Sequence, residues 1–323
     1  MRRRRLLVGL LAAVGALVAA PAALAHGDRV PIDELGSAWR FEPIVLALTA
    51  LALALFGQAW WRLRRRGRSD HASWGRVGLF LAGMALLVLP VVSPLDAAGE
   101  EYLLSAHMLQ HVLIGDAAPA LLVVAIRGPL SVFLLPPVVL RPLARLRPVR
   151  TFFGELLTPR VAFTFWAATF AIWHVPDMYD AVLTNRLLHD LEHTMFVVAG
   201  LLVWTQLIDP MRHGRLRRSA KIGAAVGLFA MGNVLADVLL FARSAIYPAY
   251  AAQDERLFGF SPINDQQFAG GVMMIEQALT LGLFLMLFFL NEEQRERRDE
   301  EEPEPVERAD EAAPPGRPVA DDG

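Results

Sequence analysis

Two pairs of histidines have a spacing that could hold a metal ion: His107 with His111, and His189 with His193. Residues i and i+4 lie one turn apart on the same face of a helix, so each pair would present two imidazoles together. His174, at the end of another apolar segment, would add a fifth imidazole at a similar depth. Several imidazoles in one layer suit copper or haem iron. The alternative is that each histidine makes an interhelical hydrogen bond.

The other possible ligands are limited by composition. The chain has no cysteine, which excludes disulfides, iron–sulfur clusters, zinc-thiolate sites and thiol catalysis. Soft-metal chemistry would rest on histidine and methionine, and Met108 is a candidate, although methionine in an apolar span also serves as packing. His26 is a further candidate, because cleavage before it would free an α-amine to chelate copper with its imidazole; otherwise it is a polar terminus.

Further polar residues occur within or beside the apolar segments, where ionisable groups are costly and often functional. Those that could support the site are Glu192, Asn233, Asp237, Asp265 and Glu276. Asp116 lies about 180° around its helix from His107 and should face elsewhere. For Asp116 and Asp237 the alternative is a structural pair with an arginine from a loop.

The elements that would carry these residues are membrane-spanning helices. The chain is 54% hydrophobic, above the share in a soluble domain, and it contains seven apolar segments of roughly spanning length. These segments are 43–62, 76–95, 103–125, 160–176, 187–208, 220–243 and 268–290. We therefore predict an all-α polytopic membrane protein with a seven-helix transmembrane domain over residues 43–290.

The two ends differ from this domain. Four arginines, an apolar run and the Ala23-Leu24-Ala25 site indicate a signal peptide over residues 1–25; the alternative is an uncleaved anchor. Residues 26–42 would then lie outside, and the acidic residues 291–323 would form a disordered cytoplasmic tail. The short segment Pro129–Leu140 is predicted to lie at the membrane interface or to re-enter it.

Four motifs, in order along residues 43–290, resemble the CtaG-type assembly factors for caa3-type cytochrome c oxidase. The motifs run over 106–111 with 118–122, over 173–181, over 188–193 and over 265–274, where Met274 replaces a tryptophan of many members. The resemblance implies a multi-pass protein of the bacterial plasma membrane. It also implies a protein needed to make active haem–copper oxidase, at a copper-insertion step.

The expected function is a non-enzymatic assembly factor that handles copper. Its outer-side cluster, His107, His111, His174, His189 and His193, would pass copper to an oxidase subunit or to another copper chaperone. Two rival functions use the same residues: a bis-His haem-b electron-transfer protein, and a copper permease whose ligands would continue inward. No nucleophile–base pair points to an enzyme, and the arginines are too dispersed for nucleic-acid binding.

The loops between the segments predict the orientation. Loops 62–76, 126–160 and 209–221 are rich in arginine, whereas loops 96–102, 177–186 and 244–267 are not. The positive-inside rule therefore places the mature N-terminus outside and the C-terminus in the cytoplasm. A reporter fused after Gly67 should report cytoplasm, and one fused near Gln253 should report the outside. An outside signal at Gly67 would reverse the placement of every histidine.

Overall fold

A computed structural model describes residues 29–211 and 214–301, with side chains to residue 290, and all regular structure in these residues is helical. Six stretches are long and apolar enough to cross a membrane. They are α2 (Pro43–Arg65), α3 (Trp74–Val92) with the turn before it, a composite helix over Leu104–Ala125, α12 (Arg186–Ile208), α13 (Arg218–Phe241) and α15 (Pro262–Glu301). A seventh span forms if α9 (Arg147–Leu156) and α10 (Pro159–Trp173), bent by 63° at their junction, are counted together.

The predicted all-α membrane fold is confirmed, whereas the predicted signal peptide and His26 lie outside the described residues. Short elements precede or connect the spans. They are η1 (Leu35–Ser37), η2 (Ser69–His71), α4 (Pro94–Glu101), α7 (Pro129–Phe133), α8 (Pro137–Arg145), α11 (Pro176–Thr184), α14 (Pro248–Ala251) and η4 (Leu257–Gly259). The segment predicted to lie at the interface forms α7 and the start of α8.

The last helix differs from its predicted bounds. It begins at Pro262 instead of residue 268, and it continues to Glu301 instead of ending at 290. The first eleven residues of the predicted disordered tail are therefore helical, because Glu, Gln and Arg are good helix formers even where no apolar face remains. The chain divides into a unit ending at Gly282 and a second unit from Leu283, and the site described below lies in the first.

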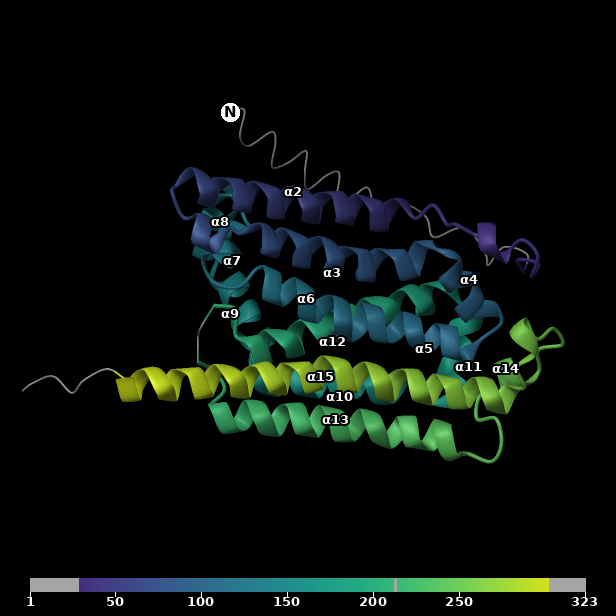
Figure 1. The fold of residues 1–323 in the computed structure, drawn as a ribbon. Coiled ribbons are helices and arrows are strands. Elements are labelled where there is room, and N and C mark those ends of the chain that lie inside the picture. Colours follow the sequence, from purple (N-terminus) through teal and green to yellow (C-terminus); the bar gives the residue numbers. More distant parts are fainter. Residues whose placement is uncertain (1–28, 212–213, 302–323) are drawn as a thin grey trace, which may run out of the picture. The chain divides into compact units, whose positions relative to one another are not determined.

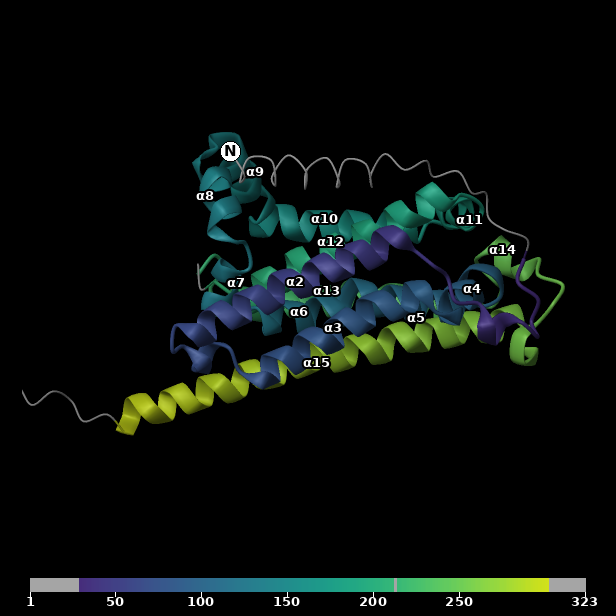
Figure 2. The ribbon, with the colours of Figure 1, turned by 90° about the horizontal axis from the view of Figure 1, so that it is seen from above.

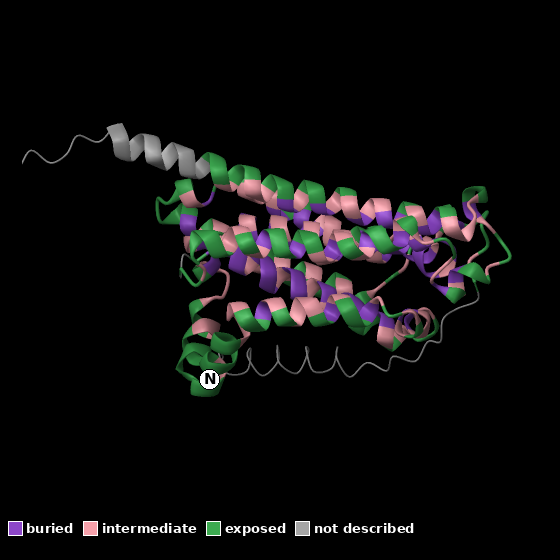
Figure 3. Ribbon diagram, turned by 90° about the horizontal axis from the view of Figure 1, so that it is seen from below, coloured by how far each residue is buried: buried purple, intermediate pink, exposed green. Residues whose placement is uncertain are grey.

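Helix α12 occupies the middle of the first unit (Figures 1 and 2). It packs against α10, α11, α13 and the composite helix, and buried residues recur along it from His189 to Leu207. Exposed apolar side chains such as Leu48, Val234 and Leu279 lie on the outer helices, so the exposed colour dominates their outward faces (Figure 3). This distribution is that of a bundle whose solvent is lipid.

The composite helix is interrupted two residues after His111. It consists of α5 (Leu104–Val112), the π-helical η3 (Leu113–Ala117) and α6 (Ala118–Ala125). Pro119 has no amide hydrogen to donate, and its ring crowds the carbonyl four residues earlier, which belongs to Gly115. The widened turn accommodates this conflict, as π-bulges commonly do. The freed Gly115 carbonyl faces Gly200 of α12, where an added Cβ would lie 2.0 Å from the Gly115 oxygen.

Two polar caps set where the histidine-bearing helices begin. Asn185 caps α12 by accepting hydrogen bonds from the amides of Leu187 (3.0 Å) and Leu188 (3.3 Å). The α5 helix has no cap of its own, and Asp265 of α15 supplies one. Its carboxylate accepts from the amides of Leu104 (2.7 Å) and Ser105 (3.1 Å). A carboxylate at a helix N-terminus also complements the helix dipole.

The close approach of α12 and η3 generates a stability prediction. Gly200→Ala should destabilise the protein by about 1–3 kcal/mol, because the new methyl group overpacks the Gly115 carbonyl. The matched control is Gly227→Ala in α13, where a Cβ meets nothing within 4 Å. Thermal unfolding of the purified protein in detergent should show a lower midpoint for Gly200→Ala only. Equal midpoints for the two variants would contradict the close contact.

Candidate metal centre

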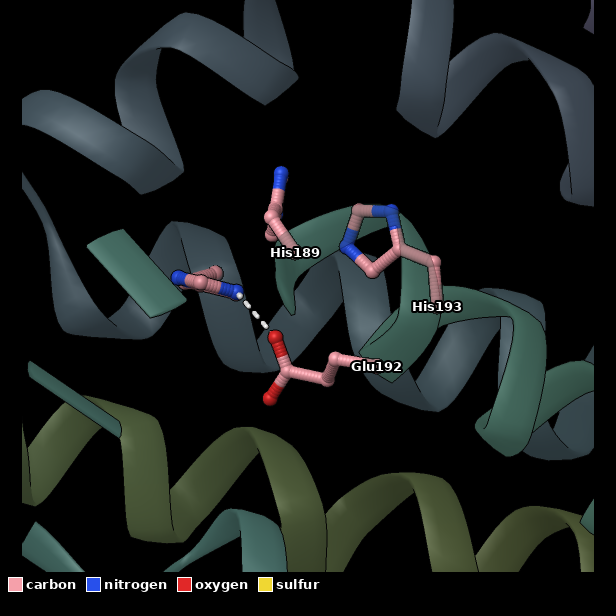
Figure 4. A group of neighbouring side chains, drawn as sticks. His189, Glu192 and His193 are labelled. Atoms are coloured by element: carbon pink, nitrogen blue, oxygen red, sulfur yellow. Dashed lines mark ion pairs between the residues drawn. The ribbon is translucent and has the colours of Figure 1, made fainter. Parts of the chain in front are cut away.

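Helix α12 places His189, Glu192 and His193 on one face within a single turn (Figure 4). The spacing i, i+3, i+4 brings the three side chains together, and the rings of His189 and His193 lie 4.0 Å apart between centroids. All three residues are buried, and Glu192 is completely so. These residues form one side of the candidate centre.

Helix α5 supplies the other side. The rings of His107 and His111 are 4.3 Å apart, and each faces a histidine of α12. His107 lies 5.5 Å from His189, and His111 lies 5.3 Å from His193, between ring centroids. Both α5 histidines are buried. The two i, i+4 pairs predicted from the sequence therefore meet across one helix–helix contact.

Glu192 lies between the two helices as a shared negative charge. Its Oε2 atom is 3.5 Å from His111 Nε2 and 3.8 Å from His107 Nε2, and both distances are too long for a normal hydrogen bond. Several buried ring and carboxylate atoms of this cluster have no hydrogen-bond partner among the described residues. They are Nε2 of His107, His189 and His193, both ring nitrogens of His111, and both oxygens of Glu192.

This group of unpartnered atoms fits a cation. A buried polar atom without a partner costs about 1–3 kcal/mol, and one metal ion bonded to several of them would remove that cost. The ligand atoms of His107, His189, Glu192 and His193 all lie within 4.8 Å of one another. Tetrahedral ligands at about 2.1 Å from an ion are about 3.4 Å apart, so small side-chain rotations would close the set.

Two of these histidines contact groups outside the cluster through their Nδ1 atoms. His107 Nδ1 is 3.1 Å from the hydroxyl of Tyr250, and that hydroxyl donates to the carbonyl of Gly99 at 2.5 Å. His189 Nδ1 is 2.7 Å from a carboxylate oxygen of Glu100. In both cases the partner occupies Nδ1 and leaves Nε2 toward the cluster.

Asp96, Glu100 and His189 form a second group with metal-like spacing, but its oxygens are already occupied. Arg40 contacts Asp96 and Glu100 at 2.7 Å each, and Gln110 donates to the other Asp96 oxygen at 2.6 Å. Burial alone would raise the pKa of Glu100, yet the hydrogen bond and charge of His189 and the Arg40 guanidinium lower it to about 2. Burial and the neighbouring Glu100 charge raise the pKa of Asp96 to about 6. We interpret this group as support for His189.

Other predicted ligands are separate from the four-donor set. His174 donates from Nδ1 to the carbonyl of Phe170 at 2.7 Å, and its ring packs on Phe170. It directly follows the last residue of α10, Trp173. Met108 packs in an apolar cluster with Tyr179 and Met273. His111 stands next to the set through its contact with Glu192.

Of the predicted supporting residues, only Glu192 joins the centre. Asp265 caps α5, and Asn233 donates to Gln277 at 3.3 Å. Asp237 is exposed near the end of α13. Glu276 lies one turn before Thr280 on α15, away from the histidines in sequence and in its contacts.

The partners of Asp116 differ from the loop arginine that was the alternative interpretation for it. Asp116 accepts from the Trp204 indole and from the Thr280 hydroxyl, the latter at 3.1 Å. Both donors come from neighbouring helices at the same level, so no side chain has to reach in from a loop. Asp116 is not part of the histidine cluster, as its angular offset predicted.

Sequence reasoning did not identify Tyr250, Glu100, Gln110 or Arg40 as part of this region. Tyr250, Glu100 and Arg40 have no regular spacing relative to the histidines, because they come from segments that connect or precede the spans. Gln110 lies on α5 itself, three residues after His107. The only available signal was a pair of adjacent acids, Glu100 and Glu101, in a short non-basic loop.

Comparison with known proteins gives one match. A family model described as cytochrome c oxidase caa3 assembly factor matches residues 54–292, which is most of the chain. Searches of curated proteins and of solved structures found no significant match. The matched region contains every histidine of the centre.

The unpartnered carboxylate generates a prediction that separates stability from binding. Glu192→Gln should leave the metal-free protein as stable as the wild type or more stable, because the substitution removes a buried charge that has no hydrogen-bond donor. The same variant should bind a divalent metal more weakly, since a charged ligand is lost. Thermal unfolding without metal and equilibrium dialysis with metal measure the two effects. A clear loss of metal-free stability would show that Glu192 is a structural residue.

Proposed function

Because this chain belongs to the caa3-type cytochrome c oxidase assembly factors, we propose that its histidine centre holds copper and delivers it during oxidase assembly. The observation that carries the proposal is the set of buried, unpartnered donor atoms of His107, His189, His193 and Glu192. The copper ion is cargo, and the protein supplies ligands that can be exchanged.

The chemistry of the donors supports copper. Imidazole binds copper, zinc, iron and nickel, and at a given site Cu²⁺ binds most tightly of the divalent first-row ions. With no cysteine in the chain, the centre has no thiolate that would trap the ion. Imidazole and carboxylate ligands release an ion to a stronger acceptor more readily than a thiolate set does. A carrier needs this property.

The position of the centre suits transfer to a partner. His107 is the fourth residue of α5, and His189 is the fourth residue of α12, so the cluster lies near one end of the bundle. The arginine pattern predicts that this is the outer end and that the C-terminus is in the cytoplasm, and the proposed membrane is the bacterial plasma membrane. The partner would be an oxidase subunit or another copper chaperone. His111, one turn deeper and beside Glu192, could take the ion as it changes ligands.

The two rival functions have less support. A bis-His haem needs a flat macrocycle between its axial imidazoles, whereas these rings lie 4.0–6.3 Å apart and pack on Tyr179 and Phe196. An inward copper path would need ligands below His111, and Asp116, in the η3 turn that follows α5, already accepts from Trp204 and Thr280. An optical spectrum of the purified protein tests the haem function directly.

The central prediction concerns His107 and His193, which lie on different helices of the centre. The double variant His107→Ala, His193→Ala should lose most bound copper and most oxidase activity, because the remaining donors cannot complete a coordination shell. Protein level should not change. Copper per protein and oxidase activity in the same membranes are the measurements. Lowering the pH should weaken copper binding to the wild type, since a protonated imidazole cannot be a ligand.

The control is His71→Ala, because His71 lies in the 3-10 turn η2 beside Asp70 and outside the centre. It should retain copper and oxidase activity. Deletion of the gene sets the lower limit of oxidase activity and of subunit copper content. Normal oxidase activity in the double variant would refute the site, even if the gene itself is required.

A further inference from the structure

The hydroxyl of Tyr250 has only one hydrogen, and its surroundings decide where that hydrogen goes. The Gly99 carbonyl, 2.5 Å away, can only accept, so the hydroxyl donates to it. Toward His107 Nδ1, at 3.1 Å, the same hydroxyl can then act only as an acceptor. His107 must therefore carry its hydrogen on Nδ1, which leaves a lone pair on Nε2. That Nε2 atom is one of the unpartnered atoms of the centre.

Glu100 imposes the same choice on His189. Its side chain is an ionised carboxylate, because Arg40 pairs with one oxygen at 2.7 Å, and such a group accepts hydrogen bonds without donating. The other oxygen lies 2.7 Å from His189 Nδ1, so that nitrogen is the donor. The unpartnered Nε2 of His189 again points away from Glu100 and toward the other ligands.

We propose that Tyr250 and Glu100 are positioning residues, which hold His107 and His189 in the tautomer and orientation that direct Nε2 to the metal. This inference rests on the proposed function, since it assigns the residues behind the copper ligands. Metal-bound histidines usually donate their other ring nitrogen to a carboxylate, carbonyl or similar group, and loss of that partner weakens the site.

The support extends to the segment before the first span. Arg40 holds Glu100, and it is itself anchored by a hydrogen bond from its amide to the Val92 carbonyl at 2.9 Å. Arg40 also pairs with Asp96, whose second oxygen accepts from Gln110. The orientation of His189 therefore depends on a chain of contacts that begins outside the helical domain.

The aromatic cluster around His107 offers a matched pair of variants. Tyr250 and Tyr247 are both buried in it, and the Tyr247 hydroxyl donates to the backbone carbonyl of His174 at 3.2 Å instead of to a ligand ring. Tyr250→Phe should weaken copper binding about 10- to 100-fold, as measured by competition with a chelator of known affinity. Tyr247→Phe should leave copper affinity within a few fold of the wild type.

Glu100 has a conservative rescue. Glu100→Gln retains an oxygen that can accept from His189 Nδ1, whereas Glu100→Ala does not. The Ala variant should lose copper affinity to an extent similar to Tyr250→Phe, and the Gln variant should recover most of it. Equal losses for Gln and Ala would show that the charge of Glu100 matters and not its hydrogen bond, which would overturn its positioning role.

A second readout needs no copper. Nitrogen NMR of imidazole-labelled, metal-free protein distinguishes the two neutral tautomers of each histidine. His107 and His189 should be protonated on Nδ1 in the wild type, and His107 should lose that preference in Tyr250→Phe. Nε2-protonated rings in the wild type would overturn this inference even if copper binds. If the wild type shows the expected tautomers but binds no copper, the proposed function is contradicted and this inference is not.

Discussion

The rest of this structure depends on one constraint, the burial of polar groups without hydrogen-bond partners. These groups are a carboxylate and several imidazoles, and they are enclosed in an apolar helix bundle. Moving such groups out of water costs free energy unless they are paired. Among the described residues, Nδ1 of His107 is paired with Tyr250 and Nδ1 of His189 with Glu100. Nε2 of both rings and both oxygens of Glu192 have no hydrogen-bond partner. A bound cation would offset the remaining cost, and this is the observation behind the proposed copper centre.

The cluster forms because specific residues fix where α5 and α12 begin and how closely the two helices approach. Asn185 begins α12, so that His189, Glu192 and His193 fall on one inward face. Asp265 begins α5 from another helix and thereby fixes the level of His107. Gly200 lets α12 approach the widened turn after His111. A shift of one residue at either helix start would rotate the imidazoles by about 100° and separate the donors.

The family motifs therefore contain residues with different physical tasks. His107, His189, Glu192 and His193 provide donor atoms. The motif over 265–274 contributes none: Asp265 caps α5, and Gln266 accepts from the Ile246 amide at 2.7 Å, which holds the loop after α13. The family motifs therefore contain both the donor atoms of the cluster and residues that position the surrounding helices.

Much of this protein was determined by sequence alone. Hydrophobic segment lengths predicted the spans, because a bilayer requires about 20 apolar residues per crossing, and the i, i+4 spacing predicted two imidazole pairs.

Only the tertiary structure decided which pairs meet. Periodicity gives the face of one helix and says nothing about its neighbour, so Asn233, Asp237 and Glu276 were predicted to support the histidines although their contacts lie elsewhere. Tyr250, Glu100 and Arg40 have no periodic relation to the ligands, since they reach the centre from connecting segments. His174 was predicted as a fifth ligand, and only the structure shows that its Nδ1 instead donates to the carbonyl of Phe170.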